Sequence, residues 1–302
     1  MARAILITGT STGAGRVIAE ALAFAGHRIF ASMRDPNFKN REQANALWSR
    51  GIDVVPLDVT EDWSVDRAVD MVLKKAGRID VLVNNVHIFP TGVTEAFTSA
   101  QAKAVFDINV VGLLRVTRAV LPEMRRQGDG LIVNIGSIFG RVTIPFLGIY
   151  GSTQFAIEAL SDSLHAELAP LGVEVVLVQR ATCPAARKQA TSRESVERMA
   201  AYGAAEDEPY GRLPDLFARH QPAASSEIED VPSALVQLVA MPKWCRPTRS
   251  VVGASLGADL INATAASVQM RILDDLGLKA GAICDLPDAR PSNEGAARAP
   301  PD

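Results

Sequence analysis

The chain has 302 residues, of which 48% are hydrophobic and 22% charged, an ordinary globular mixture that argues against a disordered chain. The formal net charge of −3 provides no strong field for nucleic acid or an anionic membrane, so neither is an expected partner. No apolar run reaches the roughly 18 residues that a membrane-spanning helix requires. The three cysteines, Cys183, Cys245 and Cys284, are scattered, which disfavours a disulfide scaffold or a structural zinc site. These features make the cytoplasm the expected compartment.

Short β-rich runs alternate along the chain with longer segments of helical character. Most of these runs are nearly continuously apolar, which is expected for strands covered on both faces. The predicted strands lie, in chain order, at Ala4–Thr8, Arg28–Met33, Asp53–Pro56, Val81–Asn84, Leu131–Ile135, Glu174–Gln179 and Ser250–Gly253. The predicted helices lie at Gly15–Ala25, Phe38–Ser49, Ser64–Ala76, Gln101–Arg126, Tyr150–Leu168 and Ile228–Met241. This order predicts βαβ units, and therefore a single doubly wound α/β domain with a parallel sheet and helices on both faces.

Two segments interrupt the alternation of strands and helices. Residues 182–229 are long and polar, and they follow the sixth predicted strand. Because ligands bind outside the carboxyl ends of such strands, this segment is predicted either to form a substrate lid or to be a solvated, partly helical excursion. Residues 279–302 lack periodicity and are predicted to be a disordered tail, which leaves residues 1–278 as the folded domain.

A glycine-rich segment joins the first predicted strand to the first predicted helix. It reads Thr8-Gly9-Thr10-Ser11-Thr12-Gly13-Ala14-Gly15. Glycines permit a tight turn and let backbone N–H groups approach a pyrophosphate at a helix N-terminus. Because the segment follows a strand and opens a helix, it predicts a dinucleotide site rather than a bare turn. The candidate contacts are Gly9, Ser11, Thr12, Gly13 and Gly15.

The spacing Gly-x-x-x-Gly-x-Gly resembles that of the short-chain dehydrogenase/reductase family, and further motifs extend the resemblance. They are Asp58-Val59 after the third predicted strand, Asn84-Asn85 after the fourth, Asn109 within a helix, Ser137, and Tyr150 13 residues beyond Ser137. The resemblance implies a Rossmann-type domain in which Asp58, Val59 and Asn85 contact a nicotinamide cofactor. It also implies a homodimer or homotetramer, because the helices predicted at 101–126 and 150–168 resemble those that pair between subunits in the family.

The same resemblance implies the catalytic roles. Ser137 would hold a carbonyl oxygen, Tyr150 would transfer a proton, and Asn109 would organise the helix and a proton-relay water. In the family a lysine four residues after the tyrosine binds the nicotinamide ribose and lowers the tyrosine pKa. This chain carries Gln154 there, which can hydrogen-bond a ribose hydroxyl but has no charge, so Tyr150 is expected to be a poor proton donor near neutral pH.

Cofactor choice is predicted from the end of the second strand. An NAD-preferring protein would place a carboxylate there to accept hydrogen bonds from the ribose 2′-OH. Met33 is expected at that place, followed by Arg34, whose guanidinium suits a 2′-phosphate. The sequence therefore favours NADP over NAD. The alternative is that Arg34 is a surface charge paired with Asp35.

Two further departures from the family pattern fall near the expected nicotinamide site. Asn85 is followed by Val86-His87 instead of Ala-Gly, and Arg180-Ala181 replaces the usual Pro-Gly turn after the sixth strand. His87 could replace the missing acid/base chemistry, because imidazole titrates near neutrality, or it could be a loop histidine bonded to backbone. Arg180 could hold an acidic group or be a surface residue. The histidines show no metal-ligand spacing, so no metal is expected.

Three functions remain open from the sequence. The first is an NADP(H)-linked oxidoreductase that acts on the carbonyl or hydroxyl group of a small hydrophobic substrate. The second is a non-redox enzyme on the same scaffold, a lyase, isomerase, dehydratase or cyclase, in which Ser137 and Tyr150 stabilise an enolate. The third is a dinucleotide-binding protein without catalysis. The chemistry of the site, and not the fold, distinguishes these three functions.

Overall fold

Seven parallel strands form the central sheet of the computed structural model, which describes residues 2–181, 187–188, 193–202, 219 and 227–278. The strand order is β3-β2-β1-β4-β6-β7-β9, and every adjacent pair is parallel. The strands are β1 (Ala4–Ile7), β2 (Arg28–Met33), β3 (Asp53–Pro56), β4 (Val81–Asn84), β6 (Gly130–Ser137), β7 (Val173–Ala181) and β9 (Arg249–Gly253). This topology confirms the predicted doubly wound α/β domain.

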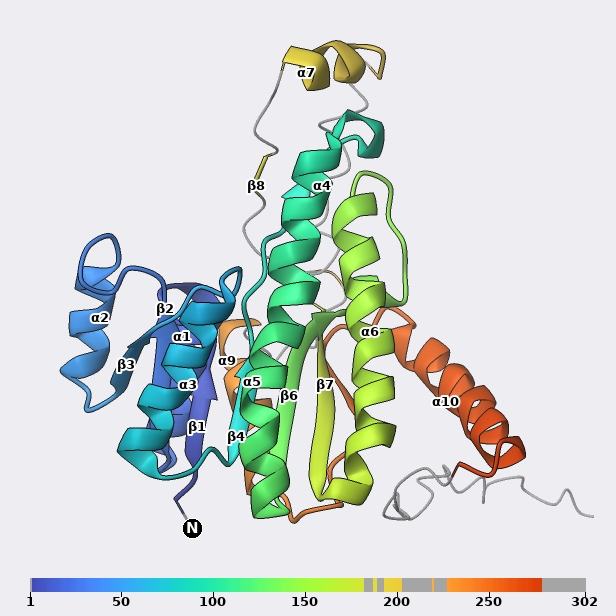
Figure 1. Ribbon diagram of the computed structural model, residues 1–302. Helices are drawn as coiled ribbons and strands as arrows, with labels where there is room; N and C mark the ends of the chain where they lie inside the picture. Colours follow the sequence, from blue (N-terminus) through green and yellow to red (C-terminus); the bar gives the residue numbers. More distant parts are fainter. Residues whose placement is uncertain (1, 182–186, 189–192, 203–218, 220–226, 279–302) are drawn as a thin grey trace, which may run out of the picture.

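Helices cover both faces of the sheet (Figure 1). Successive side chains of a strand point to opposite faces, so Ile5 and Leu6 of β1 enter different apolar clusters. The cluster of Ile5 is closed by α1 (Gly13–Phe24) and α9 (Glu227–Ala240). The cluster of Leu6 is closed by α3 (Asp62–Ala76), α5 (Gly112–Gln127) and α6 (Gly148–Leu168). Burial on both faces explains why the strands read as continuous apolar runs.

Other elements surround this core. There are four further helices, α2 (Arg41–Trp48), α4 (Ser99–Phe106), α7 (Arg193–Ala200) and α10 (Ala258–Asp275). There are also 3₁₀ turns at Thr94–Ala96, Ile138–Gly140 and Ala169–Leu171. A separate two-stranded sheet consists of β5 (Pro90–Thr91) and β8 (Arg187–Lys188). Most of the segment predicted as a lid, and the predicted tail, lie outside the described residues; β8 and α7 are described parts of the former.

Two of the differences between the structure and the predicted elements concern long helices. The helix predicted at 101–126 is divided, because a π-helical segment at Asp107–Val111 separates α4 from α5. Helix α10 was not predicted. It extends away from the sheet in Figure 1, and its Leu260 is 72% exposed, so it carries little of the periodic core-facing pattern that identifies a packed helix.

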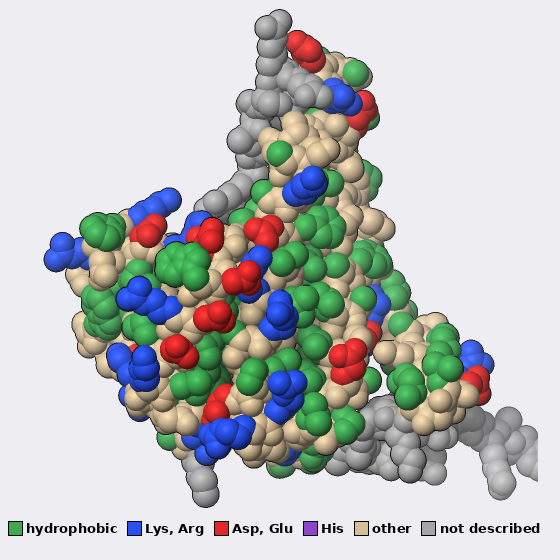
Figure 2. Space-filling view, in the orientation of Figure 1, with side chains coloured by type: hydrophobic (Ala, Val, Ile, Leu, Met, Phe, Trp, Pro, Cys, Tyr) green, Lys and Arg blue, Asp and Glu red, His purple; other side chains and the backbone are tan. Residues whose placement is uncertain are grey.

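Charged side chains of both signs are interspersed over α3 and α5 on the face shown in Figure 2. Several of them form ion pairs, such as Arg115 with Asp62 and Arg126 with Glu123. Within the described part of the chain, no helix combines the length and apolar character needed to cross a bilayer.

Candidate active site

The glycine-rich segment forms the turn between β1 and α1. Gly9 and Gly13 have φ of 72° and 62°, in the left-handed region that favours glycine. A Cβ on Gly15 would lie 2.3 Å from the Gly9 carbonyl oxygen and 2.4 Å from Asn85 Nδ2, so only glycine fits there. The N-cap residue Thr12 makes no side-chain cap bond, and the first turn of α1 has no acidic residue. The free N–H groups at this helix end are suited to an anion.

A cavity of about 310 Å³ lies over this turn and the carboxyl ends of the neighbouring strands. Most of the predicted cofactor-binding residues line it, together with one predicted catalytic residue: Gly9, Ser11, Thr12, Gly13, Gly15, Arg34, Asp58, Val59, Asn85 and His87. Val86, Phe89 and Arg180 also line it, so the cavity extends from the glycine turn toward the residues around Tyr150. The turn, the helix end and this elongated cavity fit a dinucleotide.

The end of β2 presents Arg34, not Met33, to the cavity. Met33 is 2% exposed and packs in the core, which corrects its expected place beside the ribose. The Arg34 guanidinium lies 3.9 Å from the Asp58 carboxylate, and its side chain is 61% exposed. The ion pair is therefore with Asp58, not the Asp35 considered from the sequence. An exposed pair of this kind contributes little free energy, so Arg34 remains able to bind an anionic ligand group.

Two of the predicted asparagines form side-chain hydrogen bonds that hold neighbouring backbone segments in place. Asn85 Nδ2 donates to the carbonyl oxygens of Thr8 at 3.0 Å and Gly9 at 3.2 Å, which fixes the glycine turn. Asn109, in the π-helical segment, donates to the Ile88 carbonyl at 3.0 Å and accepts from the Ile88 N–H at 2.9 Å. π-Helical turns are frequent at functional sites, and this one holds the loop at 86–89 in place.

The predicted catalytic hydroxyls are buried beside the cavity rather than in its lining. Ser137 is 3% exposed and Tyr150 is 1% exposed. The Tyr150 ring packs edge-on against Phe89, with 4.5 Å between the ring centroids, and against Phe139 at 6.4 Å. Phe89 itself lines the cavity, so the tyrosine ring contacts a cavity-wall residue. Ser137 Oγ donates to the Arg180 carbonyl at 3.3 Å and accepts from the Phe139 N–H at 3.3 Å.

Gln154 lies on α6, one turn beyond Tyr150, and is 1% exposed. Its Nε2 donates a long hydrogen bond to Thr153 Oγ1 at 3.4 Å, and its Oε1 is buried without a partner. The buried amide thus has unused hydrogen-bonding capacity and supplies no charge to Tyr150.

Arg180 and Ala181 do not form the expected turn after the sixth predicted strand. They are the last residues of β7 and pair with Val252 and Gly253 of β9. A proline at this place would remove a backbone donor, whereas Arg180 permits the strand to continue. The Arg180 side chain lines the cavity, and its Nε is buried without a hydrogen-bond partner.

The family follows from comparison with known proteins. The family model described as short chain dehydrogenase matches residues 3–197. The chain belongs to the short-chain dehydrogenase/reductase family. The short-chain dehydrogenase structure from Streptomyces avermitilis is 26% identical, superposes with a TM-score of 0.70, and covers 92% of this chain and 97% of that one.

The chain spans less than two thirds of the length of the first curated relatives that it matches. The 3-ketodihydrosphingosine reductase of Bacteroides thetaiotaomicron is 36% identical over 175 residues, which cover 58% of this chain and 62% of the relative. The human 17-beta-hydroxysteroid dehydrogenase type 1 is 37% identical over 187 residues, which cover 59% of this chain and 56% of the relative. The family binds NAD(P) and acts on small molecules.

His87 does not titrate near neutrality. Burial, together with the positive charge of Arg180, lowers its pKa to about 3. Both ring nitrogens are buried without a hydrogen bond of good geometry, and the nearby backbone of Val86 and Asn85 offsets only part of the lowering. Near pH 7 the ring is therefore neutral and a weak proton acceptor, which favours the alternative in which His87 is not the acid or base.

The buried imidazole predicts a pH-dependent stability. The unfolded chain binds a proton at His87 below about pH 6.5, whereas the folded chain rejects it until about pH 3, so stability falls as the pH drops through this window. Between pH 7 and pH 5 the free energy of unfolding should fall by about 2 kcal/mol more in the parent than in His87→Gln. Urea unfolding at both pH values measures this, and identical pH dependence in the two proteins would contradict it.

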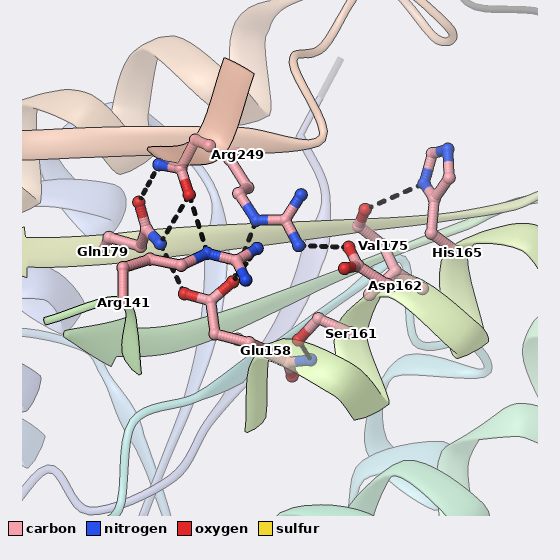
Figure 3. A network of polar contacts seen from close by, with 10 residues as sticks. Arg141, Glu158, Ser161, Asp162, His165, Val175, Gln179 and Arg249 are labelled. Atoms are coloured by element: carbon pink, nitrogen blue, oxygen red, sulfur yellow. Dashed lines mark hydrogen bonds and ion pairs between the residues drawn. The ribbon is translucent and has the colours of Figure 1, made fainter. Parts of the chain in front are cut away.

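A buried polar network joins α6 to the strands beside the site (Figure 3). Glu158 of α6 forms ion pairs with Arg141 at 3.0 Å and with Arg249 of β9 at 2.9 Å. Gln179 of β7 donates to Glu158 and accepts from Asn262 Nδ2 of α10 at 2.6 Å. Because these charges are paired with one another, the network fixes the position of α6, which carries Tyr150, against the end of β7.

Phe89 and Ile108 line the cavity but were not predicted to do so. The available signal for Phe89 was its position four residues after Asn85, in the segment that follows the fourth predicted strand. Among the described residues, no group of three or more His, Cys, Asp or Glu side chains is arranged to hold a metal ion.

Proposed function

We propose that the protein is an NADP(H)-linked oxidoreductase that acts on the carbonyl or hydroxyl group of a small hydrophobic substrate. The observation that carries this proposal is the extent of one cavity. It has the glycine turn, Arg34 and Asp58 along one part and reaches Phe89, on which Tyr150 packs, and Arg180. A nucleotide and a reacting carbonyl need such a continuous space.

Some of these residues would bind the cofactor, and others would transfer a proton to the substrate. The N–H groups at the start of α1 would hold the pyrophosphate, and Arg34 a 2′-phosphate. The bound cofactor supplies or accepts the hydride. Ser137 Oγ makes only a long hydrogen bond of 3.3 Å to the Arg180 carbonyl, so its proton is free to turn to a substrate carbonyl. Tyr150 would then transfer the proton to the same oxygen.

A hydrophobic substrate is supported by the surroundings of Tyr150. Ile144 and Leu147 pack in the same apolar cluster as the tyrosine ring. The two curated relatives are, by name, a reductase of a ketosphingosine and a dehydrogenase of hydroxysteroids. A panel of long-chain and polycyclic ketones and alcohols is therefore the first set of substrates to test.

The NADP preference gives a quantitative prediction. Arg34→Ala should remove a charged hydrogen bond to the 2′-phosphate and weaken NADPH binding by about 1.5–3 kcal/mol, with little change for NADH. The control is Arg50→Ala, because Arg50 is half exposed and paired with Glu20 but does not line the cavity. Calorimetry on the three proteins measures both affinities. Equal affinity of the parent for NADPH and NADH would contradict the preference.

A non-redox enzyme on the same scaffold is the second candidate, favoured by the uncharged Gln154 beside Tyr150. The absorbance of reduced nicotinamide separates the functions when the substrate panel is incubated with the protein and NADPH or NADP. Turnover coupled to that absorbance supports the oxidoreductase. Turnover without an absorbance change supports the non-redox enzyme, and nucleotide binding without any turnover supports a binding protein.

A further inference from the structure

Arg180 is a partly buried cation without an ionic partner among the described residues. Its Nε has no hydrogen bond, and none of the described carboxylates forms an ion pair with it. Arginine keeps its charge at neutral pH, and burying an uncompensated charge is unfavourable. A negative charge that forms beside Arg180 during the reaction would compensate its positive charge.

Two observations place Arg180 near the predicted catalytic residues. Ser137 and Arg180 are cross-strand partners in the register of β6 and β7, so their side chains point to the same face of the sheet. Arg180 and Phe89 both line the cavity, and the Tyr150 ring packs against Phe89. Arg180 therefore lies at the end of the cavity beside which Ser137 and Tyr150 are buried.

We propose that Arg180 supplies the positive charge that stabilises the Tyr150 phenolate, a charge that the neutral Gln154 does not provide. This inference rests on the proposed oxidoreductase function. In the reductive direction the O–H bond of Tyr150 breaks as the new O–H bond of the alcohol forms, while the reduced nicotinamide gives its hydride to the carbonyl carbon. The tyrosine is left as a phenolate, and Arg180 is the positioning residue that balances its charge.

Among the described residues, three further titratable groups near this end of the cavity are already neutral, paired or hydrogen-bonded. His87 is neutral, and Glu158, one turn beyond Gln154 on the same helix, is neutralised by Arg141 and Arg249. At the start of α10, Asp259 accepts a hydrogen bond from Ser255 at 2.7 Å.

The charges of Arg180 and Tyr150 are coupled in the folded protein. Burial lowers the pKa of the Arg180 guanidinium from its ordinary value, and the negative charge of ionised Tyr150 acts in the opposite direction. The same charge therefore favours the phenolate form of Tyr150 in return.

The ionisation of Tyr150 can be measured without substrate or cofactor. The chain has three tyrosines, Tyr150, Tyr202 and Tyr210, so the tyrosinate absorbance of the parent minus that of Tyr150→Phe isolates one group. We expect this group to titrate below the ordinary value of about 10 in the parent and in Arg180→Lys. In Arg180→Gln and in Arg180→Met the midpoint should rise by about one unit or more. The pH profile of turnover should move with it.

A double variant that restores a cation near Tyr150 distinguishes an effect of charge from a change in structure. In the double variant Arg180→Gln/Gln154→Lys the midpoint should fall again, because a cation is restored one helical turn from Tyr150. NADPH affinity and circular dichroism report whether each variant is folded. A midpoint that is the same in the parent and in folded Arg180→Gln or Arg180→Met would overturn the proposal, as would a parent midpoint at or above about 10.

The two proposals fail in distinguishable ways. Redox turnover with a tyrosinate midpoint that does not respond to Arg180 would overturn the role of Arg180 alone. A low, Arg180-dependent midpoint without redox turnover on any substrate would overturn the oxidoreductase function and leave the charge coupling standing.

Discussion

Tyr150→Phe is expected to lower turnover by about 100- to 1,000-fold on any substrate that the parent converts. The substitution deletes only the hydroxyl, since the ring contacts with Phe89 and Phe139 are those that a phenylalanine also makes. NADPH affinity and the free energy of unfolding should stay close to the parental values. Steady-state kinetics, together with calorimetry for NADPH, measures the effect.

Ser137→Ala should act in the same direction, because it removes the second hydroxyl donor. Its control is Ser163→Ala, in which an exposed serine of α6 loses a hydrogen bond to Glu167 and no contact with the cavity. A Tyr150→Phe variant with parental turnover would show that the proton is transferred elsewhere.

Arg246→Met is expected to lower the free energy of unfolding by about 3–5 kcal/mol. Arg246 and Glu174 form an ion pair in which the two side chains are 1% and 4% exposed. Glu174 also accepts from the Trp244 N–H at 2.9 Å, and Arg246 donates to the Leu238 carbonyl at 2.7 Å. Removal of the arginine leaves a buried carboxylate without its cation and a carbonyl oxygen without its donor, and both are unfavourable.

The control for this prediction is Arg126→Met. Arg126 pairs with Glu123 in a similar way, but its side chain is 69% exposed, so its loss should change stability by less than about 1 kcal/mol. Urea unfolding of the three proteins gives the comparison. Equal stabilities of the parent and Arg246→Met would contradict the account of this pair. Neither residue lies at the cavity, so cofactor affinity should be unchanged in the folded protein.

The strands were predictable because each is buried on both faces and therefore reads as an apolar run. β2, β3 and β4 begin and end where the sequence placed them. β6 and β7 extend further than predicted, since glycine, serine and arginine at their ends carry no apolar signal although their backbones pair. Helix α10 escaped prediction because it lies mostly outside the core.

The two ends of the site differ in how far the sequence could predict them. The glycine turn depends on backbone conformation, which the spacing of glycines encodes directly, and its predicted residues line the cavity. The orientation and ionisation of other side chains at the site depend on tertiary packing. The sequence could not show that Met33 faces the core, that burial lowers the pKa of His87, or that Arg180 continues a strand.

Hydride transfer is the most direct measure of the proposed function. The parent protein is incubated with a hydrophobic ketone and NADPH that carries deuterium at the transferable position, and the product is analysed by mass spectrometry. The account predicts an alcohol with one deuterium on the former carbonyl carbon, in an amount equal to the NADP formed and strongly reduced in Tyr150→Phe. A product that forms without deuterium, or equally well without the cofactor, would contradict it.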